Sequence, residues 1–229
     1  MEKFGKLSFI VIPPLTSFDS ELGFRNVISL LKECGYDGIE FNVTEPLGFA
    51  VSDLVNWTRD AGLDVPALLT GEAYEKGFCL SSPDESIRRK TKDLLLRYIE
   101  KAGEFESLLV LGLLQGLRSD EHDPGVANDR IVDCISEIAE EAESSGVEIV
   151  FEPVNHLQVG FNNSVSEVLS LIKRIDSPAV KPMVDTIHLN IEERSLIEPI
   201  ADCGSDLRHV HLCESNASLY GTGRIDFGA

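Results

Sequence analysis

Three residues able to bind a divalent metal stand where apolar stretches of the sequence end. Glu152 ends the run VEIVFE, and Pro153 favours extended backbone at Glu152 and stops the strand there. Asp185 ends the run VKPMVD, and His211 lies in the run LRHVHL. Carboxylate oxygens and imidazole nitrogens are ligands for divalent metals. The pattern predicts a metal site made from three strand ends, provided that the fold brings those ends together.

Two further histidines accompany these residues. His209 lies two residues before His211, so both side chains point to the same face of the strand. We predict that His211 is the ligand and that His209 has a structural role in a lower layer. His188 follows Asp185 by three residues, beyond the end of the strand, where it is either solvated or in contact with a substrate. We predict substrate contact.

The segments that carry these residues alternate between strand and helix patterns along the whole chain. Seven apolar runs of strand length are separated by stretches with helical spacing, and glycines close several of the helices. Two stretches with capping-box spacing, Ser82 to Glu85 and Ser164 to Glu167, predict helix starts at Ser82 and Ser164. Repeated strand–helix units with apolar strands indicate a parallel sheet covered by helices.

Two topologies fit this order, a doubly wound open sheet and a (β/α)8 barrel. A GxGxxG motif after the first strand and a P-loop are both missing from the sequence, which disfavours nucleotide binding. Polar residues end five of the strands, and a closed barrel gathers all of its strand ends at one mouth. We therefore predict an α/β fold of the (β/α)8 type.

This barrel is expected to be incomplete. After the seventh strand the sequence continues only as ESNASLYGTGRIDFGA, which leaves no residues for an eighth strand. The chain is thus a shortened form, or another molecule supplies the strand, or the barrel stays open. The apolar edge that results favours self-association, with a homodimer as the default. Residues 1–229 are predicted to form one barrel domain, truncated at its C-terminus.

Two glutamates and a histidine near other strand ends are further candidates. Glu40 shares a strand face with Asn42 and is expected to face the barrel interior, where a buried carboxylate needs a partner. This favours a hydrogen-bond network, with substrate contact as the alternative. Glu72, in TGEAY after the third strand, is a candidate for the wall of a substrate site, and His156 is a weaker one.

Composition narrows the class of protein. The chain has 229 residues, 43% of them hydrophobic, and a net charge of −19, which opposes binding to nucleic acid and to anionic membranes. Five scattered cysteines without CxxC spacing indicate reduced thiols. The apolar run FIVI near the N-terminus is too short for a signal peptide and is predicted to be the first strand. We expect a cytoplasmic protein.

Four segments, DGIEFNV, FEPVN, VDTIHLNIEE and HVHLCESN followed by GTGRIDF, resemble in this order the xylose isomerase-like TIM barrels. The likeness is greatest to the sugar isomerase and epimerase branch that includes the D-tagatose and D-psicose 3-epimerases. It implies a divalent metal (Mn²⁺, Co²⁺, Mg²⁺ or Zn²⁺) held by Glu152, Asp185, His211 and a second glutamate on the eighth strand.

The resemblance also implies a reaction. One glutamate removes a carbon-bound proton from an open-chain ketose to give an enediolate, and the other returns a proton. Glu152 matches the first of these glutamates, and His188 matches a position that hydrogen-bonds a substrate oxygen. The chain departs from the 3-epimerases at Gln158, where they carry a glutamate, and at Ala217, where they carry an arginine. The resemblance thus implies that a neutral amide and a methyl group replace two polar contacts to the substrate.

The resulting hypothesis is a metal-dependent sugar isomerase or epimerase, weak or inactive in this short form. A non-catalytic metal- or sugar-binding remnant of the family is the alternative. An inosose dehydratase or a hydroxypyruvate isomerase stays open within the first class. A nuclease of the endonuclease IV type is disfavoured, because LLTGE and LGLLQG lack the histidines of its zinc cluster and the charge opposes DNA.

Overall fold

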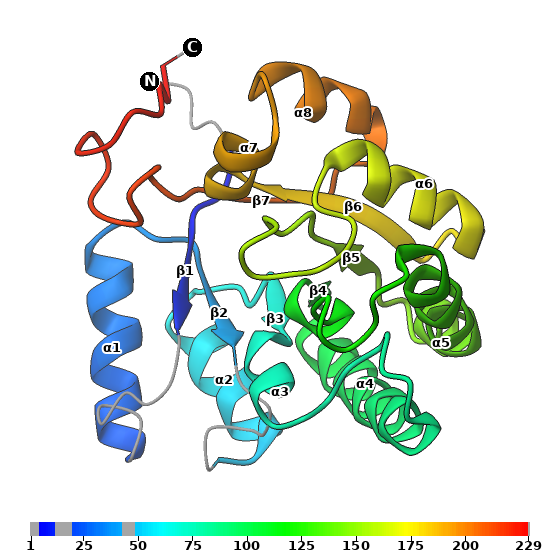
Figure 1. The fold of residues 1–229 in the computed structure, drawn as a ribbon. Coiled ribbons are helices and arrows are strands. Elements are labelled where there is room, and N and C mark those ends of the chain that lie inside the picture. Colours follow the sequence, from blue (N-terminus) through cyan, green and yellow to red (C-terminus); the bar gives the residue numbers. More distant parts are fainter. Residues whose placement is uncertain (1–4, 12–19, 43–48, 229) are drawn as a thin grey trace.

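Seven parallel strands form one curled sheet in the order of the chain. The computed structural model describes residues 5–11, 20–42 and 49–228. The strands are β1 (Ser8–Val11), β2 (Gly38–Asn42), β3 (Ala67–Leu69), β4 (Leu108–Leu111), β5 (Ile149–Phe151), β6 (Val180–Asp185) and β7 (His209–His211). Within the described residues no pairing joins β7 to β1. The prediction of an incomplete barrel of the (β/α)8 type is thus confirmed (Figure 1).

Helices cover the outside of this sheet (Figure 1). The longer ones are α1 (Glu21–Glu33), α2 (Val51–Asp60), α4 (Glu85–Phe105), α5 (Pro124–Ser144) and α6 (Val165–Ile175). Shorter elements follow three of the strands directly, namely α3 (Gly71–Glu75), the 3-10 turn η2 (Leu113–Gln115) and α7 (Thr186–Glu192). Helix α8 (Ile197–Cys203) and the 3-10 turn η3 (Gly204–Asp206) lead into β7.

One of the two predicted helix starts is confirmed and the other is wrong. Ser164 and Glu167 form both hydrogen bonds of a capping box at the start of α6. Helix α4 begins two residues later than predicted, because Asp84 rather than Ser82 accepts the hydrogen bond of the first turn, from the Ser86 N–H at 2.7 Å. The Ser82 hydroxyl is already used, since it accepts from the Asp84 N–H.

The strands separate two apolar layers. The larger layer lies between the outer face of the sheet and the helices, and includes Phe24, Phe41 and Leu95. The smaller layer lies inside the curl of the sheet and consists of buried side chains from four strands: Ala67, Leu69, Val110, Val150 and Met183. Since side chains alternate along a strand, Glu152 and Asp185 share the inner face with Val150 and Met183. The two carboxylates therefore lie one layer beyond this inner apolar cluster.

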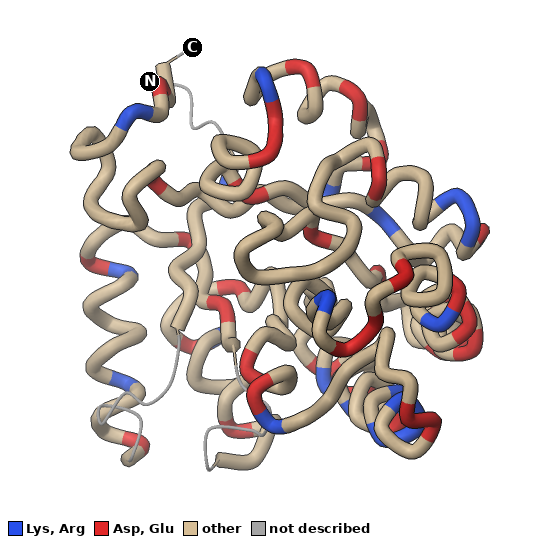
Figure 2. Tube along the Cα trace, viewed as in Figure 1, with Lys and Arg blue, Asp and Glu red and all other residues tan. Residues whose placement is uncertain are grey.

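Charged side chains are spread along the helices and loops, with acidic and basic residues interspersed (Figure 2). All five cysteines are free. None of the helices in the described parts of the chain combines the length and the apolar character that crossing a membrane requires.

Candidate metal centre

Strands β6 and β7 bring Asp185 and His211 face to face. The two residues are partners in the parallel register, and the Oδ2 atom of Asp185 lies 3.9 Å from Nδ1 of His211. The same Nδ1 atom lies 3.6 Å from Oε1 of Glu152, at the end of β5. All three residues are buried. The structure therefore brings the three strand-end residues together around one ring nitrogen.

The turn into α7 fixes the orientation of the Asp185 carboxylate. Asp185 is the N-cap of this helix, and its Oδ1 atom accepts a hydrogen bond from the Ile187 N–H at 2.9 Å. One oxygen is thereby committed to the helix, which leaves Oδ2 directed towards His211. The helix cap therefore uses one oxygen of Asp185 and leaves the other available to a metal.

His188, on α7, lies beside this group, and its neighbours determine which ring nitrogen carries the proton. The Asn155 amide nitrogen lies 2.8 Å from Nδ1 of His188. Because an amide nitrogen only donates, Nδ1 accepts and the neutral ring keeps its proton on Nε2. That Nε2 atom lies 3.8 Å from Oε1 of Glu152. His188 thus presents a hydrogen-bond donor towards Glu152 rather than a free lone pair.

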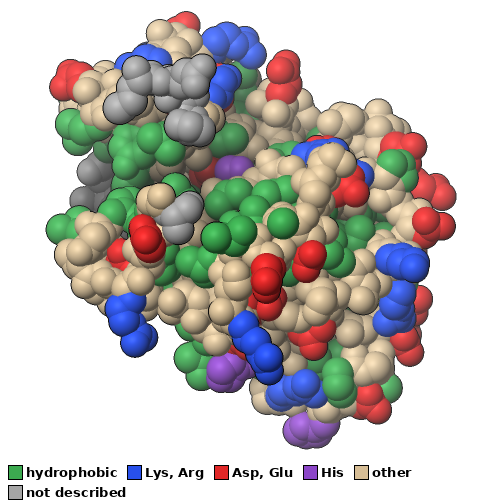
Figure 3. All heavy atoms as spheres, turned by 90° about the horizontal axis from the view of Figure 1, so that it is seen from above, with side chains coloured by type: hydrophobic (Ala, Val, Ile, Leu, Met, Phe, Trp, Pro, Cys, Tyr) green, Lys and Arg blue, Asp and Glu red, His purple; other side chains and the backbone are tan. Residues whose placement is uncertain are grey.

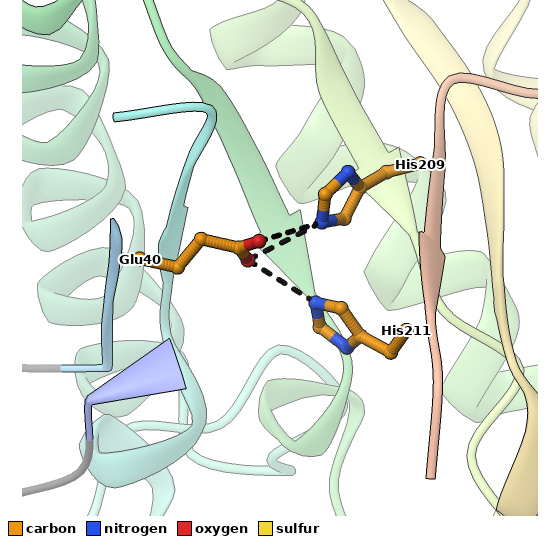
Figure 4. A group of neighbouring side chains, drawn as sticks. All are labelled: Glu40, His209 and His211. Carbon is orange, nitrogen blue, oxygen red and sulfur yellow. Dashed lines mark hydrogen bonds and ion pairs between the residues drawn. The ribbon is translucent and has the colours of Figure 1, made fainter. Parts of the chain in front are cut away.

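The far side of the His211 ring contacts Glu40 of β2. Oε2 of Glu40 lies 3.3 Å from Nε2 of His211, and both oxygens lie 3.2 Å from Nε2 of His209 (Figure 4). The Ser8 hydroxyl also donates to Glu40. The hydrogen-bond network expected around Glu40 is therefore present in the structure.

Burial and charge perturb the ionisation of the cluster. Burial opposes charge on His211, but hydrogen bonds and attraction from Glu152 and Glu40 outweigh it and raise the pKa of the ring to about 10. Burial raises the pKa of Asp185 to about 6, and repulsion from Glu152 adds to the effect. For Glu40 the contacts with His209 and His211 outweigh burial and lower the pKa to about 2. Contact with His211 likewise outweighs burial at Glu152 and lowers its pKa.

Two residues that the sequence did not single out shape the surroundings of Glu152. A Cβ atom at Gly112, just after β4, would lie 2.6 Å from Oε2 of Glu152, so only glycine leaves room for the carboxylate. The fully buried Gln115 donates from Nε2 to the backbone oxygen of Glu152 at 3.2 Å. Its Oε1 atom accepts from the side chain of Asn162 at 2.8 Å. The motif LGLLQG contains both residues, but their contacts with Glu152 depend on the tertiary fold.

The remaining candidates lie farther from these contacts. Glu72, on α3, forms an ion pair with Lys76 at 3.0 Å. Gln158 is exposed and accepts from Asn155 at 3.3 Å, which connects it to His188 through one side chain. The exposed His156 pairs with Glu192 at 2.5 Å. Of these three, Gln158 has the most direct connection to the cluster.

A buried glutamate after β7 organises the C-terminal segment. The fully buried carboxylate of Glu214 accepts hydrogen bonds from the N–H groups of Ser215, Gly221 and Ile225. These bonds lower the pKa of Glu214 to about 2. Ala217 and Asp226 lie in the segment that Glu214 holds, and Asp226 caps its own turn by accepting from the Gly228 N–H.

The donor set fits a divalent metal. Oε1 of Glu152 and Oδ2 of Asp185 each lie within 4 Å of Nδ1 of His211, and two carboxylates with an imidazole nitrogen suit Mn²⁺, Co²⁺ or Zn²⁺. Ligand atoms of Glu152, Asp185 and His188 also lie within 4.8 Å of one another, although the proton on Nε2 makes His188 the weaker ligand. Three protein ligands are typical of catalytic metal sites, which keep a position for water or substrate. On the face shown in Figure 3 a histidine side chain is visible within a hollow bordered by hydrophobic side chains.

Known proteins share this fold and part of this sequence. A ketose 3-epimerase from Arthrobacter globiformis is 28% identical over 214 residues, which cover 92% of this chain and 72% of that protein. A D-psicose 3-epimerase from Ruminiclostridium cellulolyticum is 29% identical over 212 residues, covering 90% of this chain and 71% of that protein. A crystal structure of D-psicose 3-epimerase with D-tagatose, from Clostridium cellulolyticum, superposes with a TM-score of 0.82 and 26% identity. That alignment covers 96% of this chain and 77% of the other.

The family model described as "xylose isomerase-like TIM barrel" matches residues 28–229, which is most of the chain. The match includes β2 to β7 and therefore every strand that carries a residue of the candidate metal centre. The chain belongs to the xylose isomerase-like TIM barrel family.

Proposed function

We propose that this protein is built for divalent-metal-dependent epimerisation or isomerisation of an open-chain ketose. The observation that carries the proposal is the convergence of Glu152 and Asp185 on Nδ1 of His211, at 3.6 and 3.9 Å. The ketose 3-epimerases among the relatives support the choice of substrate class.

Glu152, Asp185 and His211 are the proposed metal ligands. When bound, a divalent ion supplies Lewis acidity that polarises the carbonyl of a ketose and makes the neighbouring carbon-bound hydrogen more acidic. Asp185 and His211 would serve only to hold the ion. Glu152 would hold it as well and would also act on the substrate.

Glu152 is the proposed general base. Its lowered pKa keeps the carboxylate ionised at neutral pH, so it can accept a proton from the carbon next to the carbonyl. Transfer of that proton to Glu152 gives an enediolate. A proton returned to the opposite face of the same carbon gives the epimer, and a proton returned to the neighbouring carbon gives the isomer. Gly112 leaves space for this carboxylate, and Gln115 donates a hydrogen bond to the backbone oxygen of Glu152.

The proposed role of His188 is to bind a substrate oxygen. Asn155 makes the ring donate from Nε2, and a donor suits a hydroxyl or carbonyl oxygen of a sugar. Gln158, linked to His188 through Asn155, is a proposed substrate contact beside it. Glu72 stays a candidate for the wall of the site. Glu40 is hydrogen-bonded to His209 and His211.

Proton exchange is the reaction to test first, because it needs only one base. The Mn²⁺-loaded chain is incubated in D₂O with D-psicose, D-tagatose, D-fructose or L-ribulose, and the proton signal on carbon 3 is followed by NMR. We expect the signal of at least one ketose to decay, and Glu152→Gln to abolish the decay. Metal and ketose binding without exchange would favour the alternative of a non-catalytic binding protein.

Two expectations about the protein in the cell stay predictions. Sedimentation velocity at several concentrations tests whether the chain forms a homodimer. The residues to change are Phe9 of β1 and Val210 of β7, which face outward and are 43% and 38% exposed. A cytoplasmic location agrees with the free cysteines and is checked by fractionation.

A further inference from the structure

A compact polar group lies inside the curl of the sheet next to the candidate metal centre. It consists of Glu40 on β2 and of His209 and His211 on β7 (Figure 4). The carboxylate of Glu40 is 1% exposed, and both rings turn their Nε2 atoms towards it at 3.2 to 3.3 Å. The two strands stand far apart in the sheet order, so the contact crosses the interior rather than following the sheet.

The contact determines which nitrogen of His211 is available to a metal. An ionised carboxylate only accepts hydrogen bonds, so Nε2 of His211 carries the proton that Glu40 accepts. The lone pair of the neutral ring is then on Nδ1, and this is the atom that lies near Glu152 and Asp185. Outer carboxylates of this kind fix the orientation and proton position of metal-binding histidines, and raise their basicity.

His209 gives Glu40 a second fixed partner. Its Nε2 atom lies 3.2 Å from each carboxylate oxygen, and its ring packs edge-on against His211 with the ring centres 5.0 Å apart. A buried carboxylate needs such partners to offset its desolvation. The Ser8 hydroxyl of β1 donates to the same carboxylate. Glu40 is therefore held on three sides in the position that meets His211.

We propose that Glu40 is a positioning residue of the metal centre, holding His211 with Nδ1 free for the ion, and that His209 keeps Glu40 in that position. The inference rests on the proposed function, since it concerns the same site. In this role Glu40 acts on His211 and does not contact the substrate.

The same three side chains also form a set that an ion itself can use, and the two arrangements exclude each other. Ligand atoms of Glu40, His209 and His211 lie within 4.8 Å of one another, and two histidines with one glutamate suit zinc. An ion at this position would take the lone pair of His211 at Nε2, and the proton would move to Nδ1 beside Glu152. A neutral imidazole has only one lone pair, so His211 cannot serve both positions.

Titration of the full chain with Mn²⁺ by calorimetry separates these arrangements. For Glu40→Gln we expect binding of one ion per chain with an affinity about 10 to 100 times lower than in the wild type. His209→Asn should weaken binding in the same direction by a smaller factor. Glu148→Gln is the matched control, because the Glu148 carboxylate pairs with Arg208 rather than with a side chain of the cluster, and its loss should leave the affinity unchanged.

The absorption spectrum of the Co²⁺-loaded protein distinguishes the proposed positioning role of Glu40 from a purely structural role. If Glu40 positions His211, the visible bands of Glu40→Gln should shift in position or intensity, whereas they should not shift in Glu148→Gln. If Glu40→Gln fails to fold, His209→Asn carries the test, with the same spectral change expected.

Three results would overturn the inference. Wild-type affinity and spectrum in Glu40→Gln would show that Glu40 does not act on the metal. Binding that His209→Asn abolishes and that Asp185→Asn leaves intact would place the ion between Glu40 and the two histidines. An absence of binding in the wild type would remove the proposed function itself, whereas the first two results leave metal binding in place.

Discussion

The backbone of Gly112 adjoins the carboxylate of Glu152 so closely that a Cβ atom at residue 112 would lie 2.6 Å from Oε2. The same Cβ would lie 3.1 Å from a methyl group of Val154. Gly112 directly follows β4 and is the N-cap of η2, and its lack of a side chain leaves this space open. The absence of a side chain at the end of β4 thus leaves the space that the Glu152 carboxylate occupies.

Replacing Gly112 should therefore disturb the metal centre. We expect Gly112→Ala to displace the Glu152 carboxylate, weaken Mn²⁺ binding at least about tenfold and lower the free energy of unfolding by about 1–3 kcal/mol. Gly103→Ala is the matched control, because a Cβ at that helical position meets only ordinary contacts at 3.9 Å. Calorimetry and urea denaturation measure both effects, and unchanged Mn²⁺ affinity in Gly112→Ala would contradict the account.

Gln115 should prove important although it is not a ligand. Gln115→Leu removes the donor to the Glu152 carbonyl and one of the two acceptors of the buried Asn162 amide, which keeps its hydrogen bond to Asn128. Each lost buried partner costs about 1–3 kcal/mol, so we expect a loss of unfolding free energy in that range. Gln158→Leu changes an exposed glutamine of the loop that follows β5 and should be close to neutral. Equal urea midpoints for the two variants would show that the Gln115 network contributes nothing.

Asp185 should destabilise the metal-free protein. Its pKa of about 6 lies above its ordinary value of 3.8, so ionisation works against folding, and this penalty grows between pH 3.8 and 6 and is complete above. Asp185→Asn keeps an acceptor for the Ile187 N–H and removes the charge. We expect it to stabilise the metal-free protein at pH 7.5 by on the order of 1–3 kcal/mol while abolishing Mn²⁺ binding. Thermal or urea unfolding in the presence of EDTA checks the sign, and a loss of stability would contradict it.

Metal binding should release a proton from His211. With a pKa of about 10 the metal-free ring is protonated on both nitrogens at neutral pH, and Nδ1 must lose its proton to bind an ion. The affinity for Mn²⁺ should then rise about tenfold per pH unit between about pH 7 and 9. Calorimetry in two buffers of different ionisation enthalpy should show about one proton released, and identical heats in both would refute this.

The same shift has a consequence for the metal-free protein. Because the folded pKa of His211 exceeds the ordinary value of 6.5, the charged ring stabilises the fold fully below pH 6.5, and this stabilisation is lost as the pH rises towards 10. His211→Gln should remove this part of the pH dependence, which urea midpoints measured in EDTA across that range will show.

The strand ends were predictable from the sequence because local signals define them. Apolar runs, Pro153 and the capping residues of α6 mark where strands and helices begin and end, and the order of the elements indicates a parallel sheet. The short elements α3 and α7 were not predicted, because a helix of one or two turns has too little periodicity to be read from sequence. The capping role of Asp185 depends on α7 and was missed for the same reason.

Contacts between distant residues set the limit of the sequence prediction. Glu40 was expected to face the barrel interior, but its partners lie 169 and 171 residues away and no spacing rule connects them. The same holds for Gly112 and Gln115, whose importance comes from the position of Glu152 on the neighbouring strand. Residue types identified the candidate ligands, and only the fold showed what holds them.

The central claim, that three strand ends form one metal site, is tested most directly by titrating the chain with Mn²⁺ in a calorimeter beside Asp185→Asn. We expect one ion bound per wild-type chain and none by the variant, which should still be folded. Binding that survives in Asp185→Asn, or a wild-type chain that binds no Mn²⁺ at all, would contradict it.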